Sequence, residues 1–263
     1  MLILVPSFVD VRCVYDGGEK YMSQQSDIEW TDATWNPVTG CTKVSPGCAN
    51  CYAETFAERF RGVPNHPFEQ GFDLKIWEQR LNLPLEWKKP KKIFVNSMSD
   101  LFHPQVPDSY ILKVFEVMNK AYWHEFQLLT KRHERLLELN NLLNWSKNIW
   151  MGVSVENQIY TKRIDYLRQT NAFIKFLSIE PLIGQINNLN LLDIDWVIVG
   201  GESGRKPRPI QEDWVKIIRK ECLDAKVPFF FKQWGGINKK RAGRLLENHT
   251  YNEMPVKFIL KTG

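Results

Sequence analysis

Short apolar runs alternate with longer amphipathic stretches from residue 90 onward. The runs are 93–95, 126–129, 149–153, 176–179, 196–199 and 229–231. Continuous runs of this length are typical of strands that are buried on both faces of a parallel sheet. Between them, apolar residues recur every three or four positions over 110–121, 160–167 and 214–225, which predicts helices.

The spacing of these elements predicts the fold class. The midpoints of successive runs lie roughly 20–33 residues apart, which suits β-α-β units with right-handed crossovers. Together with a further strand expected near residues 28–30, they predict an α/β fold, namely a (β/α) barrel or partial barrel with parallel strands. An open doubly wound sheet is the alternative, because the pattern does not distinguish a closed sheet from an open one.

Polar or charged residues follow every one of the six runs. In chain order they are Asn96, Ser97, Ser99 and Asp100; Thr130 and Lys131; Ser154 and Glu156; Glu180; Glu202 and Ser203, after Gly200-Gly201; Lys232 and Gln233. The carboxyl ends of parallel strands meet at one edge, and sites in α/β folds are built there. Any one of these residues could simply begin a loop, but six such groups in succession favour a site.

Composition narrows the class of protein. The chain has 263 residues, of which 43% are hydrophobic and 25% are charged, and this excludes a disordered, collagenous or disulfide-framework protein. The formal net charge of +5 permits an anionic partner without requiring one. The apolar start at residues 1–5 is broken by Pro6, and we expect no membrane segment and a cytoplasmic location.

The first 21 residues differ from the rest of the chain. They show no clear period and are followed by a polar stretch, and the turn signal Asp16-Gly17-Gly18 lies near their end. Residues 1–21 are therefore a possible N-terminal appendage, with a true N-terminal strand as the equal alternative. Residues 22–263 then form a single barrel domain with a C-terminal extension.

Three of the five cysteines lie in one loop. Cys41, Cys48 and Cys51 have the spacing C-x6-C-x2-C, and glycine and proline between them allow the backbone to fold around a centre. Residues 53–59 look helical, so Cys51 lies near a helix start, where partial positive charge stabilises thiolates. Cys222 lies on an apolar helical stripe and Cys13 in the N-terminal stretch, so neither is expected to bind metal.

Three thiolates fit two kinds of metal site. A zinc site needs a fourth ligand, which would come from His66, His103 or a distant cysteine. A [4Fe–4S] cluster held by three cysteines leaves one iron open to a substrate or cofactor. The number of cysteines therefore favours the cluster over zinc, and both remain open on spacing alone.

The cysteine loop, with Asn36-Pro37 before it and Tyr52-Ala53 after it, resembles the start of radical S-adenosylmethionine enzymes, especially the branch around spore photoproduct lyase. Residues 96–100, 128–131 and 153–155 resemble later strand ends of that branch. Residues 28–255 most resemble a phage-associated three-cysteine-motif family of unknown function. The motifs that carry this are 28–32, the cysteine loop, 96–102, 178–182, 199–204 and 230–235. The first cysteine gap is three residues longer than is common in radical enzymes.

The resemblance implies a cofactor pair and a set of site residues. Cys41, Cys48 and Cys51 would bind a [4Fe–4S] cluster, whose open iron would bind S-adenosylmethionine and yield a 5′-deoxyadenosyl radical. The implied cofactor-binding residues are Ser97, Ser99, Asp100, Ser154, Glu156 and Tyr52. The implied catalytic or substrate-contacting residues are Lys131, Glu180, Glu202, Lys232 and Gln233. The substrate is unknown, and an electron donor such as flavodoxin or ferredoxin is implied.

Basic segments raise a second hypothesis. The clusters at 88–92 and 239–244 could bind nucleic acid, although such runs are more often solvated surface. The glycine-rich run 200–204, followed by Arg205, Lys206 and Arg208, could hold a phosphate. The alternative function is therefore a non-catalytic iron–sulfur or zinc protein that binds nucleic acid, with nucleic acid or a partner protein as its partner.

Overall fold

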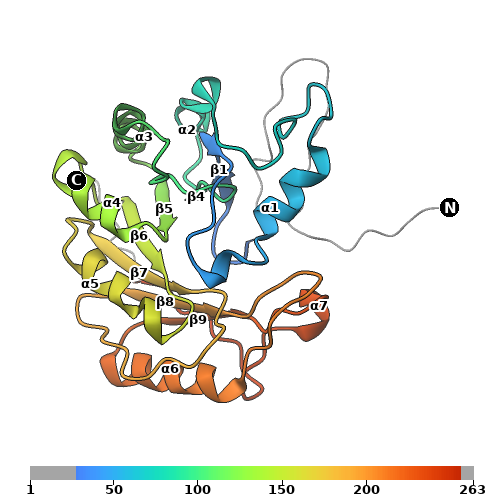
Figure 1. Cartoon of the computed structure of the whole chain (residues 1–263). Helices are drawn as coiled ribbons and strands as arrows, with labels where there is room; N and C mark the ends of the chain where they lie inside the picture. Colours follow the sequence, from blue (N-terminus) through green and yellow to red (C-terminus); the bar gives the residue numbers. More distant parts are fainter. Residues whose placement is uncertain (1–27, 256–263) are drawn as a thin grey trace.

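Seven parallel strands form the main sheet of the computed structural model, which describes residues 28–255 (Figure 1). Their order in the sheet is β1-β4-β5-β6-β7-β8-β9, and every neighbouring pair is parallel. The strands are β1 (Ala33–Trp35), β4 (Lys92–Val95), β5 (Glu125–Thr130), β6 (Ile149–Ser154), β7 (Ile174–Ile179), β8 (Trp196–Gly200) and β9 (Phe229–Gln233). The protein is thus an α/β partial barrel, as predicted. The predictions for Cys13 and residues 1–21 lie outside the described residues.

All six apolar runs are strands, but the first strand lies later than predicted. Residues 28–30 form a turn, and β1 begins at Ala33. The Thr31 hydroxyl donates to the carbonyl oxygens of Ala33 (3.1 Å) and Lys92 (2.9 Å), which closes this turn against β4. Trp30 is buried there not as a strand residue but as a ring packed into the concave side of the sheet.

Aromatic rings fill the amino-terminal half of the concave face and show how strongly the sheet curls. Trp30 contacts Phe94 of β4 (centroids 4.9 Å apart) and Trp196 of β8 (6.1 Å), although three strands separate β4 from β8. Trp196 also packs against Trp150 and Phe230. Edge contacts of this kind stabilise beyond simple burial. The aromatic cluster therefore closes the half-barrel at the amino-terminal ends of its strands.

Helices cover the convex face, against the larger of the buried clusters. The α-helices are α1 (Tyr52–Ala57), α2 (Leu83–Glu86), α3 (Asp108–Lys120), α4 (His133–Leu139), α5 (Lys162–Arg168), α6 (Glu212–Ala225) and α7 (Lys239–Ala242). Short 3-10 turns occupy Pro46–Cys48, Glu58–Phe60, Glu78–Arg80, Asn140–Leu142 and Gln158–Thr161. The three predicted helical stretches correspond to α3, α5 with its preceding turn, and α6. Cys222 of α6 is fully buried, as its position on the apolar stripe predicts.

A long connection between β1 and β4 carries the cysteines. It contains β2 (Val38–Thr39) and β3 (Lys75–Ile76), which form a separate two-stranded antiparallel sheet, with the cysteine loop and α1 between them (Figure 1). A bridge between Gly40 and Ser99 ties the start of the loop to the residues that follow β4. Within residues 28–255, no helix is long and apolar enough to cross a membrane.

Candidate functional site

The cysteine loop, residues 41–51, crosses the edge at which the sheet strands end. Cys41, Cys48 and Cys51 are all free thiols and all partly exposed. Cys48 ends a 3-10 turn, and Cys51 is the residue that precedes α1. Side chains from three different strand ends hold this loop in place, and each contact is described in turn below.

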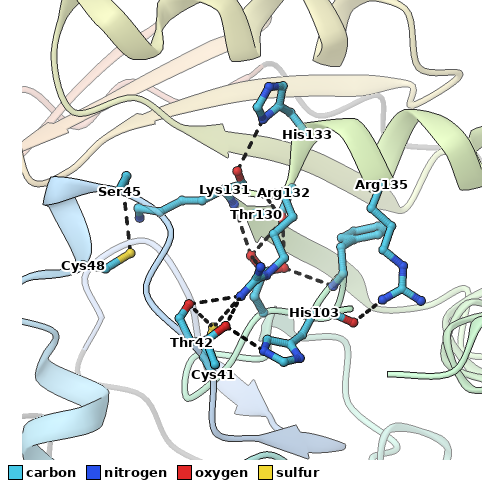
Figure 2. Close-up of polar contacts among 12 residues, drawn as sticks. Cys41, Thr42, Ser45, Cys48, His103, Thr130, Lys131, Arg132, His133 and Arg135 are labelled. Carbon is cyan, nitrogen blue, oxygen red and sulfur yellow. Dashed lines mark hydrogen bonds and ion pairs between the residues drawn. The ribbon is translucent and has the colours of Figure 1, made fainter. Parts of the chain in front are cut away.

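Arg132, which follows β5, holds the beginning of the loop. Its Nη2 donates to the Thr42 carbonyl (3.0 Å) and hydroxyl (2.9 Å) and lies 3.6 Å from the Cys41 sulfur (Figure 2). Asp100 supports this arrangement, because its Oδ2 lies 3.7 Å from Arg132 Nε and accepts from the Thr130 hydroxyl and the Lys131 amide. The carboxylate of Asp100 is therefore already hydrogen-bonded within the chain.

Glu156, which follows β6, holds the middle of the loop. It is fully buried, and its two oxygens accept from Arg163 Nη1 (2.8 Å) and from the Ser45 hydroxyl (2.5 Å). Gly47 packs directly on it, since a Cβ at Gly47 would lie 2.3 Å from Glu156 Cγ. Lys131 Nζ is 3.9 Å from the same carboxylate. The loop is thus fitted closely to a buried, charge-paired glutamate.

Glu202, which follows β8, holds the end of the loop. Asn50 donates to it at 2.9 Å, and Arg208 binds it through its backbone amide and its guanidinium. Burial raises the pKa of Glu202, but these hydrogen bonds outweigh burial and leave the pKa below its usual value. The sequence indicated Arg208 as a candidate phosphate ligand, but in the structure its guanidinium is hydrogen-bonded to Glu202.

The two serine residues that follow β4 also form hydrogen bonds within the chain. Ser99 donates to the Val38 carbonyl at 2.8 Å, and Ser97 lies 3.3 Å from the side-chain oxygen of Asn36. The Tyr52 hydroxyl donates to the Ser97 carbonyl at 2.5 Å. Burial, together with the charges of Cys51 and Glu180, raises the pKa of Tyr52, so its hydroxyl stays protonated. These residues fix the geometry around α1, and a cofactor role for them stays a prediction.

Unlike the two glutamates that hold the loop, the ion pair of Lys232 and Glu180 on the concave side of the sheet has an oxygen without a hydrogen-bond partner in the described chain. Lys232 and Glu180 form an ion pair at 3.1 Å, each less than one-fifth exposed. Gly200 makes room for this pair, since a Cβ there would lie 2.5 Å from Glu180 Oε1. That Oε1 is buried and has no hydrogen-bond partner within residues 28–255. Glu180 Oε1 therefore keeps acceptor capacity that the described chain does not use.

Further buried polar atoms on strands and strand ends lack partners. In the described part of the chain these include both amide atoms of Gln127 and of Asn96, the Ser178 hydroxyl and Gln233 Oε1. Gln127 is in register with Phe94 and Trp150, so it shares the concave face with the aromatic cluster. Buried polar atoms normally find hydrogen-bond partners, so these atoms have hydrogen-bonding capacity that the described chain does not use.

The surroundings of Cys41 and Cys51 favour the protonated thiol. Burial raises the pKa of Cys41 to about 11 and the charge of Asp100 adds to this, whereas Arg132 opposes it. Burial also raises the pKa of Cys51, and Cys48 adds to the rise at both of the other thiols, so the three interact. Among residues 28–255, no three His, Cys, Asp or Glu side chains converge on one ion position. Each thiolate of an iron–sulfur cluster binds a different iron, so cluster ligands need not converge.

The two histidines proposed as a fourth zinc ligand have other partners. His66 stacks on Phe60, with centroids 3.8 Å apart, and its Nδ1 accepts from the Phe68 amide. His103 contacts the Thr42 hydroxyl through Nε2 (2.9 Å) and accepts from the Gln105 amide through Nδ1. Both rings are thereby used in holding their own loops.

The structure brings the predicted site residues to one edge, although it also adds residues that the sequence did not indicate. These are Asn50, Ser45 and Arg132, which hold the loop, Arg163, which binds Glu156, and Gln127 and Ser178, which have unpaired atoms. A signal existed for Gln127 and Ser178, because each is a polar residue inside an otherwise apolar run. Arg163 and Ser45 carried no comparable signal, since their contacts join distant parts of the chain.

Residues 25–255 match the model of one protein family, described as "Protein of unknown function (DUF5131)". The chain belongs to this family. No curated protein matches the chain. Solved structures similar to it include a cysteine-to-serine variant of spore photoproduct lyase, with 11% identity and a TM-score of 0.47 over 77% of this chain and 64% of that one. A further variant, with bound AdoMet and dinucleoside spore photoproduct, has 11% identity and a TM-score of 0.44 over 72% and 60%. The chain thus spans less than two thirds of these proteins.

Proposed function

We propose that this protein is an iron–sulfur enzyme of the radical S-adenosylmethionine type. In this proposal Cys41, Cys48 and Cys51 hold a [4Fe–4S] cluster at the carboxyl ends of the strands. After one-electron reduction by an external donor, the bound cluster would supply the electron that cleaves S-adenosylmethionine to methionine and a 5′-deoxyadenosyl radical, and this radical would abstract hydrogen from a substrate.

One observation carries the proposal. A loop with three free thiols is anchored over the open end of a parallel half-barrel by residues that follow three different strands, namely Arg132, Glu156 and Glu202. Anchoring at three points restricts the loop and so holds the thiols in place, as a preorganised binding site requires. The resemblance of the cysteine motif to radical enzymes supports the same conclusion.

Other residues of the chain would bind the cofactor, contact the substrate and exclude water. The unpaired oxygen of Glu180 and the hydroxyl of Ser178 are suited to accept hydrogen bonds from the amino or hydroxyl groups of a bound cofactor. Lys131, Lys232 and Gln233 lie on the same edge and would contact carboxylate or substrate groups. The aromatic cluster around Trp196 closes the half-barrel at the amino-terminal ends of its strands and would keep water from the reacting atoms.

Cleavage of S-adenosylmethionine tests this proposal. The full chain is reconstituted anaerobically with iron and sulfide, reduced with dithionite and incubated with S-adenosylmethionine, and 5′-deoxyadenosine is measured by chromatography. We expect release of 5′-deoxyadenosine from the wild type and from Cys222→Ala, whose thiol is buried in the core, but not from Cys48→Ala. A protein that carries the cluster yet releases none would contradict the enzymatic part of the proposal.

A further inference from the structure

A pocket of about 270 Å³ lies beside the cysteine loop, between α1 and the residues that follow β8. The sheet is open between its first and last strands, β1 and β9. The pocket lies between the connection that follows β1 and the residues that follow β8, the strand next to β9. Its lining includes Asn50, Tyr52, Phe56, Arg59, Arg205 and Lys206. Cys51 lies in the chain between two of these residues, so the pocket adjoins the thiols.

The walls of the pocket are largely apolar and held in place. Tyr52 is 39% exposed, and its ring is fixed by the hydrogen bond from its hydroxyl to Ser97. Phe56 packs against Phe60 and Phe68 behind it. A fixed aromatic wall of this kind provides a face on which a planar ring can stack.

Three cations line the same pocket. Arg59, Arg205 and Lys206 are exposed, and within residues 28–255 none of their charged groups forms an ion pair or a hydrogen bond. The neighbouring carboxylates are already neutralised, since Glu202 pairs with Arg208 and Glu54 pairs with Lys43 at 2.8 Å. The pocket therefore has a net positive charge with no internal counter-charge.

We propose that this pocket binds a nucleoside phosphate, with the base against Tyr52 and Phe56 and the phosphate among Arg59, Arg205 and Lys206. An inorganic anion would leave the apolar wall uncovered, and a neutral aromatic molecule would leave three cations unpaired. A ligand with both parts satisfies the whole lining. As an assignment of substrate class, this inference rests on the proposed function, because the pocket adjoins the thiols that would hold the cluster.

The nucleoside phosphate could be free or part of a single strand of nucleic acid. Binding to the full chain is therefore measured by titration calorimetry with four probes, which are thymidine 5′-monophosphate, thymidine, inorganic phosphate and a single-stranded ten-residue thymidine oligonucleotide. The variant is the double substitution Arg205→Gln and Lys206→Gln. The control is Lys88→Gln with Lys89→Gln, which removes the same charge from the other basic cluster.

We expect the monophosphate to bind at least tenfold more tightly than thymidine or inorganic phosphate. The variant should lose at least tenfold in affinity, whereas the control should not change. Tighter binding of the oligonucleotide than of the monophosphate, with the same loss in the variant, would identify nucleic acid as the source. Equal affinity of wild type and variant for both phosphorylated probes, or no binding of either, would overturn the inference.

Failure of this inference can be told apart from failure of the proposed function. The titrations are run on the protein with and without reconstitution, and they detect binding without any cleavage of S-adenosylmethionine. A protein that releases 5′-deoxyadenosine but binds none of the phosphorylated probes would refute the substrate class alone. A protein that binds them but never assembles iron would refute the enzyme proposal and leave the pocket assignment standing.

Discussion

Glu156 and Glu180 follow neighbouring strands of the same sheet, yet their surroundings differ. Glu156 is fully buried, and both of its oxygens are hydrogen-bonded, one to Arg163 and one to Ser45 of the cysteine loop. Glu180 has one oxygen paired with Lys232 and the other buried without a partner in the described chain. By sequence alone, both are simply carboxylates at strand ends.

The difference separates structural residues from candidate binding residues. A carboxylate whose two oxygens are both hydrogen-bonded within its own chain has less acceptor capacity left for a ligand, and here it positions a loop. A carboxylate with an unfilled oxygen has the capacity to bind one. On this criterion Asp100, Glu156 and Glu202 hold the loop, while Glu180 keeps an acceptor oxygen that the proposed function assigns to a ligand.

The largest expected effect follows from breaking the Glu156 interaction. Glu156→Gln leaves the guanidinium of Arg163 buried without its counter-charge, and loss of one partner of a buried pair costs about 3–5 kcal/mol of unfolding free energy. Denaturant unfolding with a fluorescence readout measures this. A loss no larger than that of Glu180→Gln would mean that the two carboxylates do not differ as described.

Glu180→Gln should lower the unfolding free energy only slightly but should slow the cleavage of S-adenosylmethionine strongly. Its partner Lys232 is partly exposed, so the unfolding free energy should fall by only about 1 kcal/mol. Loss of a charged hydrogen bond to a cofactor, about 1.5–3 kcal/mol, predicts a fall of roughly 10–100-fold in the rate of S-adenosylmethionine cleavage. Unchanged cleavage in this variant would remove Glu180 from the binding residues.

The smallest effects concern single hydrogen bonds of the loop. Ser45→Ala and Asn50→Ala each remove one bond to a buried glutamate while its arginine partner remains. A loss of about 1 kcal/mol predicts roughly fivefold faster amide exchange within residues 41–51 and little change elsewhere. Hydrogen exchange read by mass spectrometry measures this. Exchange that rises evenly over the whole chain would show that these bonds stabilise the fold, not the loop.

Much of the fold could be predicted because it depends on local pattern. The apolar runs that became β4 to β9 and the stripes that became α3 and α6 are visible in single windows of sequence. The prediction placed the first strand too early because Ile28 and Trp30 are apolar. In the structure the Trp30 ring is buried among the aromatic rings on the concave face of the sheet. Apolar character predicts burial but does not distinguish a strand from a ring inserted between strands.

The division of roles within the site could not be predicted in the same way. Whether a strand-end carboxylate is free depends on partners far away in the chain, such as Ser45 for Glu156, which are 111 positions apart. The sequence indicates which residues reach the edge of the sheet, because strand order brings them there. It does not indicate which of them the cysteine loop will occupy, since that depends on tertiary contacts of the loop.

The central claim is that Cys41, Cys48 and Cys51 together hold one cluster, and counting metal tests it most directly. Iron, acid-labile sulfide and zinc are measured per chain after anaerobic reconstitution of the wild type, of each single alanine variant of these cysteines, and of Cys222→Ala. We predict about four irons per chain in the wild type and in Cys222→Ala, and a loss of most of the iron in the other three. Stoichiometric zinc without iron, or iron retained when any of the three is replaced, would contradict this assignment.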